Sequence, residues 1–306
     1  MNDLQRYLAE EFAEDCAQGR LTRRQALKAI AGLAGTAAAA QMLDARAQST
    51  PALKAPSAPS VPSSNAPVYQ VAPDDPAIVA SSVRFNGGDA ELSGYLVRPA
   101  DGGPSPIVLV CHENRGLTRH IEDVTRRAAK AGYVALAVDL LSREGGTGAN
   151  DYDAIPAVLG KAPPERHVKD FQAGLAATKV LPFARADRVG MTGFCFGGGV
   201  TWRVAAGVPE LRAAVPFYGL PVAATEVPKI HAAVLAICAG RDERINANIP
   251  AIEAAMKQNG KTFNNIVYPD VDHAFHNDTG DRFNAAAARA AWQETLSWFD
   301  RYLKAS

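Results

Sequence analysis

A single cysteine lies in a glycine-rich frame that suits a nucleophile. Cys195 has glycines two residues before it and two residues after it, in the stretch GMTGFCFGGG at 190–199. A sharp turn from strand to helix needs nearly absent side chains at those two positions, and it lifts the central side chain clear of the sheet. The turn also places that side chain at a helix N-terminus, where backbone N–H groups favour a thiolate. We therefore interpret Cys195 as a nucleophile, with the N–H of Phe196 directed at a developing oxyanion.

Cys195 is followed along the chain by an acid and a histidine. Asp242 comes shortly after an apolar run that ends at Ala239, and His273 comes after one that ends at Tyr268. A nucleophile on such a turn needs an acid and then a histidine, each in a loop after a later strand. The frame alone is also compatible with a turn around a buried, inert cysteine, but the ordered partners favour the nucleophile.

The apolar pattern around these residues predicts an α/β domain. Two short alternating runs, 82–86 and 91–98, are joined by a glycine pair and predict an antiparallel hairpin. From residue 106 onward, continuous apolar runs alternate with helical periodicity, which is typical of strands buried on both faces and covered by helices. The expected strands are 107–111, 133–138, 188–192, 213–218, 234–239 and 263–268, and the expected helices are 121–131, 164–180, 198–206, 250–259 and 283–303. We therefore expect a mostly parallel sheet with an antiparallel N-terminal hairpin and helices on both faces, with reactive groups at the carboxyl ends of the strands.

Three motifs of this domain, taken together, resemble one known family. They are GFCFGG at 193–198, Gly240-Arg241-Asp242, and Asp272-His273-Ala274-Phe275. With them, residues 80–304 resemble an α/β-hydrolase, and specifically the dienelactone hydrolase family. The resemblance implies the α/β-hydrolase fold and a carboxylic ester hydrolase of the carboxymethylenebutenolidase type. Such an enzyme cleaves small esters or lactones through a thioester intermediate, and we expect no cofactor.

The resemblance also implies catalytic roles. Cys195 attacks the ester carbonyl, His273 moves the proton and Asp242 orients the imidazole, after which water hydrolyses the thioester. Glu243 is an alternative orienting acid, but the family's spacing from Gly240 favours Asp242.

A carboxylate after the first parallel strand is a further feature of the family. The stretch HENRG at 112–116 carries it here. The resemblance implies that Glu113 helps to deprotonate the thiol when substrate arrives and that the N–H of Asn114 is the second oxyanion donor. A solvated loop acid is the alternative interpretation of Glu113.

Three residues are candidates for binding substrate. Arg143 lies where family members use an arginine to hold the substrate's carboxylate, and a guanidinium suits bidentate capture of that group. A second arginine is expected four residues past the histidine, but this chain has Asn277 there, which weakens the case for dienelactone as the substrate. Arg282 and Arg115 are alternative sources of that charge. Tyr218 either lines the pocket or is a core tyrosine with a satisfied hydroxyl.

Other kinds of site fit parts of the pattern. A thiol at a helix N-terminus also suits a redox sensor, which needs neither Asp242 nor His273. A noncatalytic module that binds small carboxylates is another alternative, because fold does not fix function. A metal site built from His273, Glu113, His112 and His276 is disfavoured, because no HExxH or clustered ligand set accompanies them, and we expect no metal.

The composition limits the partners. The chain has 306 residues, of which 47% are hydrophobic, and its 32 Lys and Arg residues balance 32 Asp and Glu residues. Balanced charge favours neither nucleic acid nor an anionic membrane. The four cysteines show no CxxC spacing, which argues against a zinc ribbon or a disulfide framework. We expect a monomer that acts on a small molecule and has no stable membrane span.

The N-terminal segment differs from the rest of the chain. Arg23-Arg24 precede an alanine-rich apolar run at 29–40 and the small-x-small pattern Ala45-Arg46-Ala47. This pattern resembles a twin-arginine export signal, although Ala26 stands where phenylalanine is usual and residues 1–20 are unusually long and acidic for such a signal. An amphipathic helix that stays attached is the alternative, since the apolar run is too short to span a bilayer.

These features predict three segments. Residues 1–47 are a twin-arginine-like signal, 48–76 are a linker rich in Pro, Ala and Ser, and 77–306 are the hydrolase domain. Cleavage after Ala47 would place the protein in the periplasm or outside the cell. Without a functional signal it would remain in the cytoplasm.

Overall fold

The computed structural model describes residues 1–49 and 70–304, which form two compact units. Helices from the N-terminal residues up to 49, together with Asp151–Ala162, make up the smaller unit. The larger unit comprises the described residues of 70–150 and 163–304. The fold of the larger unit positions the candidate site.

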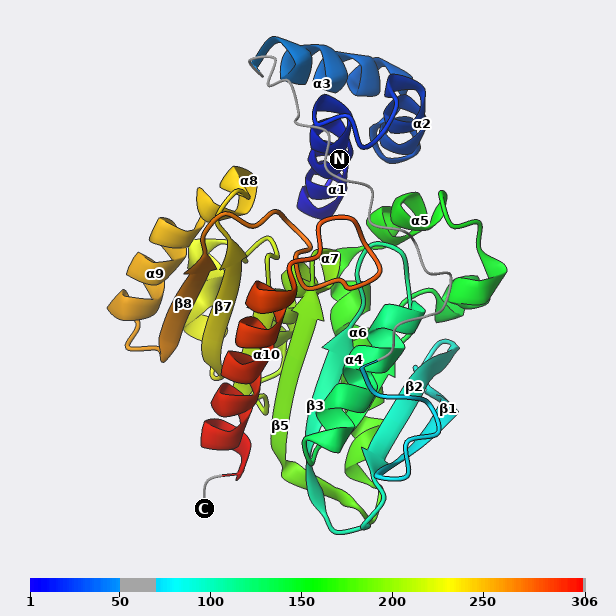
Figure 1. Ribbon diagram of the computed structural model, residues 1–306, viewed down its shortest axis with the longest axis vertical. Helices are drawn as coiled ribbons and strands as arrows, with labels where there is room; N and C mark the ends of the chain where they lie inside the picture. The colour runs from blue at the N-terminus through cyan, green and yellow to red at the C-terminus, as the bar shows by residue number, and fades with distance from the viewer. Residues whose placement is uncertain (50–69, 305–306) are drawn as a thin grey trace. The chain divides into compact units, whose positions relative to one another are not determined.

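Within the described residues, the larger unit is built on an eight-stranded sheet with the order β1-β2-β4-β3-β5-β6-β7-β8 (Figure 1). The strands are β1 (Ile78–Asn86), β2 (Glu91–Pro99), β3 (Ser105–Cys111), β4 (Val134–Val138), β5 (Ala184–Phe194), β6 (Ala213–Phe217), β7 (Ala233–Ala239) and β8 (Phe263–Tyr268). β2 pairs antiparallel with both β1 and β4, and the other neighbours are parallel. The predicted mostly parallel sheet with an antiparallel N-terminal hairpin is confirmed.

Helices cover the sheet on both faces, as expected. In Figure 1, α4 and α10 lie in front of the sheet and α7 lies behind it. The helices of this unit are α4 (Arg119–Lys130), α6 (Pro164–Lys179), α7 (Phe196–Gly207), α8 (Glu243–Asn246), α9 (Ile249–Gln258) and α10 (Ala285–Phe299). Short 3-10 turns occur at η1 (Ser142–Glu144), η2 (Thr147–Ala149) and η3 (Ala224–Lys229), and a π turn, η4 (Asp300–Lys304), follows α10.

The core lies where continuous apolar runs predicted it. Every residue of β4, β6 and β7 is buried, because both faces of these central strands pack against helices. The hairpin between β1 and β2 closes through the predicted glycine pair. Gly88 has a φ of +89°, which glycine adopts readily, and its N–H donates to the Asn86 side chain at 2.8 Å.

Some elements differ from their predicted bounds for local reasons. β5 begins at Ala184 rather than at 188, because Arg185, Asp187 and Arg188 hide the strand signal, and its pairing with β3 is irregular at Pro106/Ile107. Two short helices, α5 (Ile155–Lys161) and α8, were not expected. Neither is long enough for a 3.6-residue apolar period to stand out.

The smaller unit contains α1 (Asp3–Ala17), α2 (Arg23–Ala34), α3 (Thr36–Ser49) and α5. Capping boxes start the first two helices. Asn2 and Gln5 exchange side-chain-to-backbone hydrogen bonds at 2.8 Å in α1, and Thr22 and Gln25 form the same motif in α2. The local sequence therefore fixes where each helix begins.

The N-terminal helices pack on α5 through apolar side chains. A Cβ added at Gly160 of α5 would lie 2.5 Å from Leu33 Cδ2 and 3.2 Å from Leu8 Cδ1, so a side chain there would require the ends of these leucines to shift. Leu4, Leu8 and Ile30 are fully buried. Among the described residues, no helix combines the length and apolar character needed to cross a membrane.

The predicted export signal stays a prediction. Its expected cleavage point, after Ala47, falls inside α3, and its paired arginines occupy the exposed first turn of α2. Most of the predicted linker at 48–76 lies outside the described residues, and the boundaries 1–47 and 77–306 remain expectations.

Candidate active site

Cys195 occupies a strained turn between β5 and α7. Its φ of 57° and ψ of −119° are unusual for a residue with a side chain, and such conformations cost on the order of 1–3 kcal/mol. The N–H of Cys195 donates to the Phe217 carbonyl at 3.1 Å, which ties the turn to the end of β6. Phe196 begins α7, so its N–H belongs to the first turn, where helices leave donors without intrahelical acceptors. Its predicted role as an oxyanion donor is compatible with this position.

Glycines make this turn sterically feasible. A Cβ at Gly197 would lie 2.6 Å from the Cys111 carbonyl oxygen, and one at Gly193 would lie 2.6 Å from Thr201 Oγ1. Real Cβ atoms essentially never approach other heavy atoms so closely. The two glycines that the sequence singled out are therefore required by the close packing of β5, α7 and the end of β3.

His273 lies next to the cysteine and is held by an aspartate. A ring nitrogen of His273 and the Cys195 sulfur lie within 4.8 Å of each other. His273 Nδ1 lies 2.5 Å from Asp242 Oδ2. Because Nδ1 faces the carboxylate, Nε2 is the nitrogen left to exchange a proton with sulfur or substrate.

Asp242 is fixed at the start of α8. Its Oδ1 accepts the Ile245 N–H at 3.3 Å, so one carboxylate caps a helix and binds the imidazole. Burial on its own would raise the pKa of Asp242, but the charge of His273 and its hydrogen bond outweigh burial and hold that pKa below its ordinary value. Glu243, the alternative acid, is the first residue of α8, and it is Asp242 that contacts the histidine.

Glu113 is buried and bound to a neutral side chain. The Asn277 amide donates to Glu113 Oε2 at 2.5 Å. Burial raises the pKa of Glu113, and the charges of His120, His273 and Arg282 oppose that rise only in part. A solvated loop acid does not describe this carboxyl group, which is 8% exposed. Asn277, the predicted substrate residue, is engaged with Glu113 in this structure.

His112 braces the strand end that carries Glu113. Its Nε2 accepts the Leu140 N–H at 3.2 Å, so Nδ1 carries the proton and donates to the Glu113 carbonyl at 2.6 Å. Burial lowers the pKa of His112, which keeps this ring neutral. Both ring nitrogens of His112 are therefore engaged within the protein. Asn114 follows directly, and its oxyanion role stays a prediction.

Tyr218 packs on the imidazole of His273. Its ring centroid lies 4.9 Å from that of His273 and 5.6 Å from that of Phe275. The backbone at Tyr218 has a positive φ of 35°, and its N–H donates to Ile237. The hydroxyl is buried and has no hydrogen-bond partner among the described residues. Burial, followed by the charges of Glu113 and Cys195, raises the pKa of Tyr218 well above its ordinary value, so the group is a neutral donor.

Arg143 already binds two carboxylates. Its guanidinium contacts Asp89 at 2.5 Å and Asp170 at 2.8 Å, and the Asp170 side chain is 1% exposed. The hydrogen bond that Arg143 donates to Asp170 raises the pKa of Arg143 further above its already high value. The role of Arg143 in binding a substrate carboxylate stays a prediction.

The structure therefore brings together Cys195, His273 and Asp242, with Tyr218 on the imidazole. Asn277 joins Glu113 to the loop that carries His273. Sequence reasoning missed a buried pair, His120 and Asp278, whose side chains meet at 2.7 Å next to this group. They lie 158 residues apart, and no local pattern links them.

Comparisons of sequence and of structure relate the chain to known proteins. The model of the dienelactone hydrolase family matches residues 92–303. A protein of Methylorubrum extorquens named "Putative carboxymethylenebutenolidase" is 36% identical over 245 residues, covering 76% of this chain and 84% of that protein. A Bradyrhizobium protein named "Probable 2-oxo-3-(5-oxofuran-2-ylidene)propanoate lactonase" is 31% identical over 228 residues, covering 71% of this chain and 91% of that protein. The crystal structure of a Klebsiella pneumoniae protein titled "Putative Dienelactone Hydrolase" aligns with a TM-score of 0.69 at 30% identity, covering 74% of this chain and all of that one.

Asp242→Asn is expected to remove the carboxylate that orients the imidazole while leaving the protein folded. The amide keeps the shape of the carboxylate but no longer stabilises the imidazolium or selects its tautomer, so kcat for a short-chain aryl ester should fall by roughly 10³- to 10⁴-fold. Steady-state kinetics measure the effect. Glu243→Gln is the matched control and should retain close to wild-type kcat. Equal loss in the two variants, or none in Asp242→Asn, would contradict the assignment of the acid.

Proposed function

The chain belongs to the dienelactone hydrolase family, and from that membership and the geometry of its site we propose that it hydrolyses small esters or lactones through Cys195 and a thioester intermediate. The observation that carries the proposal is the cysteine sulfur within 4.8 Å of an imidazole nitrogen, on a histidine whose Nδ1 faces a buried carboxylate. A redox sensor has no use for that histidine–aspartate pair.

The first half of the reaction forms the thioester. The Cys195 thiol loses its proton to a base, and the sulfur adds to the ester carbonyl carbon to form a tetrahedral oxyanion. The N–H groups of Phe196 and Asn114 are the proposed donors to that oxygen. The carbon–oxygen bond to the leaving group then breaks, and the departing alkoxide takes the proton that the base accepted from the thiol and that His273 relays. The acyl group remains on sulfur.

The second half returns the free enzyme. Water adds to the thioester carbonyl while His273 Nε2 accepts its proton, and collapse of the oxyanion expels the Cys195 thiolate and releases the acid. The thiolate then takes the proton from His273. Asp242 stabilises the imidazolium that forms in each half. For a lactone, the leaving alkoxide stays tethered, so the single product is a hydroxy acid.

Glu113 is the proposed base for the thiol. A carboxylate whose pKa is raised by burial accepts a proton at a higher pH than an exposed one, which suits it to proton transfer near neutrality. The Asn277 amide that holds Glu113 is neutral, so moving the carboxylate toward sulfur breaks a hydrogen bond but no ion pair. We infer that substrate binding displaces Glu113 from Asn277.

Cys195→Ala is expected to abolish ester turnover while leaving the fold intact. Removal of the sulfur deletes the nucleophile, so kcat for a short-chain aryl ester should fall by about 10³-fold or more, and the acyl-enzyme should disappear from intact-mass spectra after rapid quenching. Cys238→Ala is the matched control, because burial raises the pKa of Cys238 to about 12, its thiol donates to Asn265 at 3.2 Å, and the proposed reaction gives it no role.

Equal turnover by wild type and Cys195→Ala would overturn the proposal. Rapid oxidation of Cys195 without turnover of any ester would favour a redox sensor instead. Binding of a small carboxylate that survives loss of both Cys195 and His273, with no turnover, would favour a noncatalytic module.

We also propose that neutral esters and lactones are accepted as readily as anionic ones. Arg143, the predicted carboxylate anchor, is neutralised by Asp89 and Asp170, and Asn277 supplies no charge at the other expected position. Removing the arginine would leave the buried Asp170 without its partner, and breaking a buried pair costs about 3–5 kcal/mol.

Arg143→Ala is accordingly expected to lower the melting temperature without changing the ratio of kcat/KM for an anionic lactone to that for a neutral ester. The control is Arg84→Ala, which removes an exposed pair with Glu91 and should change neither quantity. A selective loss of activity on the anionic lactone would instead make Arg143 a substrate residue.

Export through the twin-arginine route is proposed from the N-terminal sequence. The paired arginines, Arg23 and Arg24, are exposed at the start of α2, where a receptor can reach them. If the signal is functional, protein recovered from the periplasm should begin at Gln48 by intact-mass measurement, and Arg23→Lys/Arg24→Lys should leave full-length protein in the cytoplasm. Full-length protein in the periplasm, or no change in the double variant, would favour an attached helical segment.

A further inference from the structure

The loop after β8 carries three polar groups that face different partners. His273 and Asn277 belong to the proposed chemistry, and Asp278 follows directly. The orientation of the Asn277 amide is fixed, because its Oδ1 accepts from Thr279 N–H at 3.0 Å and from Thr279 Oγ1 at 2.6 Å. Its Nδ2 must then point to Glu113. Contacts that keep this loop in place therefore also maintain the hydrogen bond from Asn277 to the Glu113 carboxylate.

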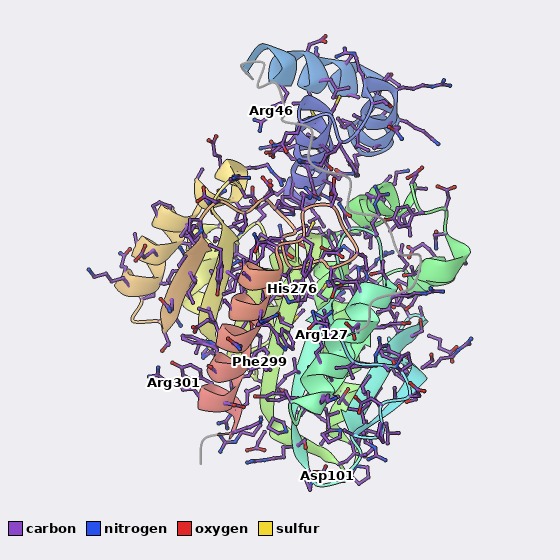
Figure 2. The ribbon with its side chains drawn as sticks, in the orientation of Figure 1. Arg46, Asp101, Arg127, His276, Phe299 and Arg301 are labelled. Carbon is purple, nitrogen blue, oxygen red and sulfur yellow. The ribbon has the colours of Figure 1, made fainter. Side chains whose placement is uncertain are left out.

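Asp278 anchors the loop to α4. Its Oδ1 lies 2.7 Å from His120 Nδ1, and its Oδ2 accepts from Arg127 at 2.5 Å. The three side chains are between 1% and 6% exposed. Arg127 is in turn fixed by Asp123, to which its Nε donates at 2.9 Å. Figure 2 labels Arg127 on α4, near His276 of the loop. The loop therefore makes a buried ionic contact with two side chains of one helix that lie seven residues apart.

The same helix follows the stretch that carries Glu113. His120 lies in the first turn of α4, only seven residues after Glu113. One nitrogen of its buried ring faces Asp278, and the other, Nε2, has no hydrogen-bond partner among the described residues. The ring also contacts His276, at 5.7 Å between centroids. Burial, followed by the charges of His120 and Arg127, lowers the pKa of His276 well below its ordinary value, so His276 is a neutral neighbour.

We propose that His120 and Asp278 form a second histidine–aspartate pair whose role is to position Glu113 and keep it ionised. The pair does not touch substrate, and it acts only through its contacts with neighbouring groups of the protein. Asp278 holds the loop so that the Asn277 amide meets the Glu113 carboxylate, and the imidazole of His120, oriented by Asp278, places its charge beside that carboxylate. The inference rests on the proposed function, because it assigns a role to a base in that reaction.

The charges around Glu113 support this role. Burial raises its pKa, and among the charges that oppose the rise, that of His120 ranks ahead of those of His273 and Arg282. Asp278 remains an anion throughout the useful pH range. Burial would raise its pKa, but the hydrogen bond from His120 and the charge of Arg127 lower it to about 2. The groups that face Glu113 come from α4, the loop after β8, the segment before α10 and the end of β6, and they are His120, His273, Asn277, Arg282 and Tyr218.

The sign of the expected effect follows from these charges. Glu113 acts as a base only when it is deprotonated, so activity is lost as the pH falls through its pKa. Removing a positive charge near a carboxylate raises the pKa of that carboxylate. The acid limb of the profile of kcat/KM against pH should therefore move to higher pH when His120 is replaced by a neutral residue.

The experiment compares two variants of the full chain with wild type. His120→Gln is expected to move the acid limb up by roughly one pH unit. Asp278→Asn is expected to lower kcat by about 10- to 100-fold while changing KM less, as is usual when a group that orients a catalytic residue is lost. A short-chain aryl ester is the substrate for both. Thermal unfolding checks that each variant is folded, and if Asp278→Asn is not, the pH profile of His120→Gln decides alone.

His231→Gln is the matched control, because His231 is exposed and distant in sequence from both partners. It should reproduce the wild-type profile. Superimposable profiles for wild type and His120→Gln, with the same kcat, would overturn the positioning role and leave the hydrolase proposal standing. Absence of turnover in wild type itself would instead remove the hydrolase proposal.

Discussion

The site depends on the close approach of backbone segments around Cys195. The end of β3, the turn after β5 and the end of β6 converge there, and glycines are the only residues that fit between them. The positive φ at Cys195 is unfavourable for a residue with a side chain, and it persists because the hydrogen bond to Phe217 and the buried first turn of α7 leave no alternative path. The stable central sheet therefore fixes the direction in which the Cys195 sulfur points.

Around that fixed point, three buried carboxyl groups have partners of different chemistry. Asp242 faces an imidazole, Asp278 faces an imidazole and a guanidinium, and Glu113 faces a neutral amide. Burial acts on all three in the same direction, so the partner decides the outcome. The pKa values of Asp242 and Asp278 fall below their ordinary values and that of Glu113 rises. The domain therefore holds two carboxylates that stay ionised, Asp242 and Asp278, and one carboxyl group, Glu113, that is suited to exchanging a proton.

The sequence predicted what is encoded locally or in chain order. The elbow glycines, the buried strands and the order of nucleophile, acid and histidine are of this kind, and the sheet topology agrees with them. The sequence could not predict contacts between residues that are far apart along the chain and meet only after folding. The pairing of Arg143 with Asp170, which lies on a different helix, is one such contact. His120 and Asp278 carry no motif, and the seven-residue helix α5 has no capping side chain to mark its start.

The packing of α5 determines which surface would be exposed if the N-terminal segment were removed. Leu8 and Leu33 rest against the glycine of a helix that the hydrolase sequence supplies more than a hundred residues later. The N-terminal helices and this internal helix therefore share one apolar interface. If the chain were cleaved after Ala47, as the sequence predicts, Leu8 and Leu33 would leave with the N-terminal segment and the apolar face of α5 would be uncovered.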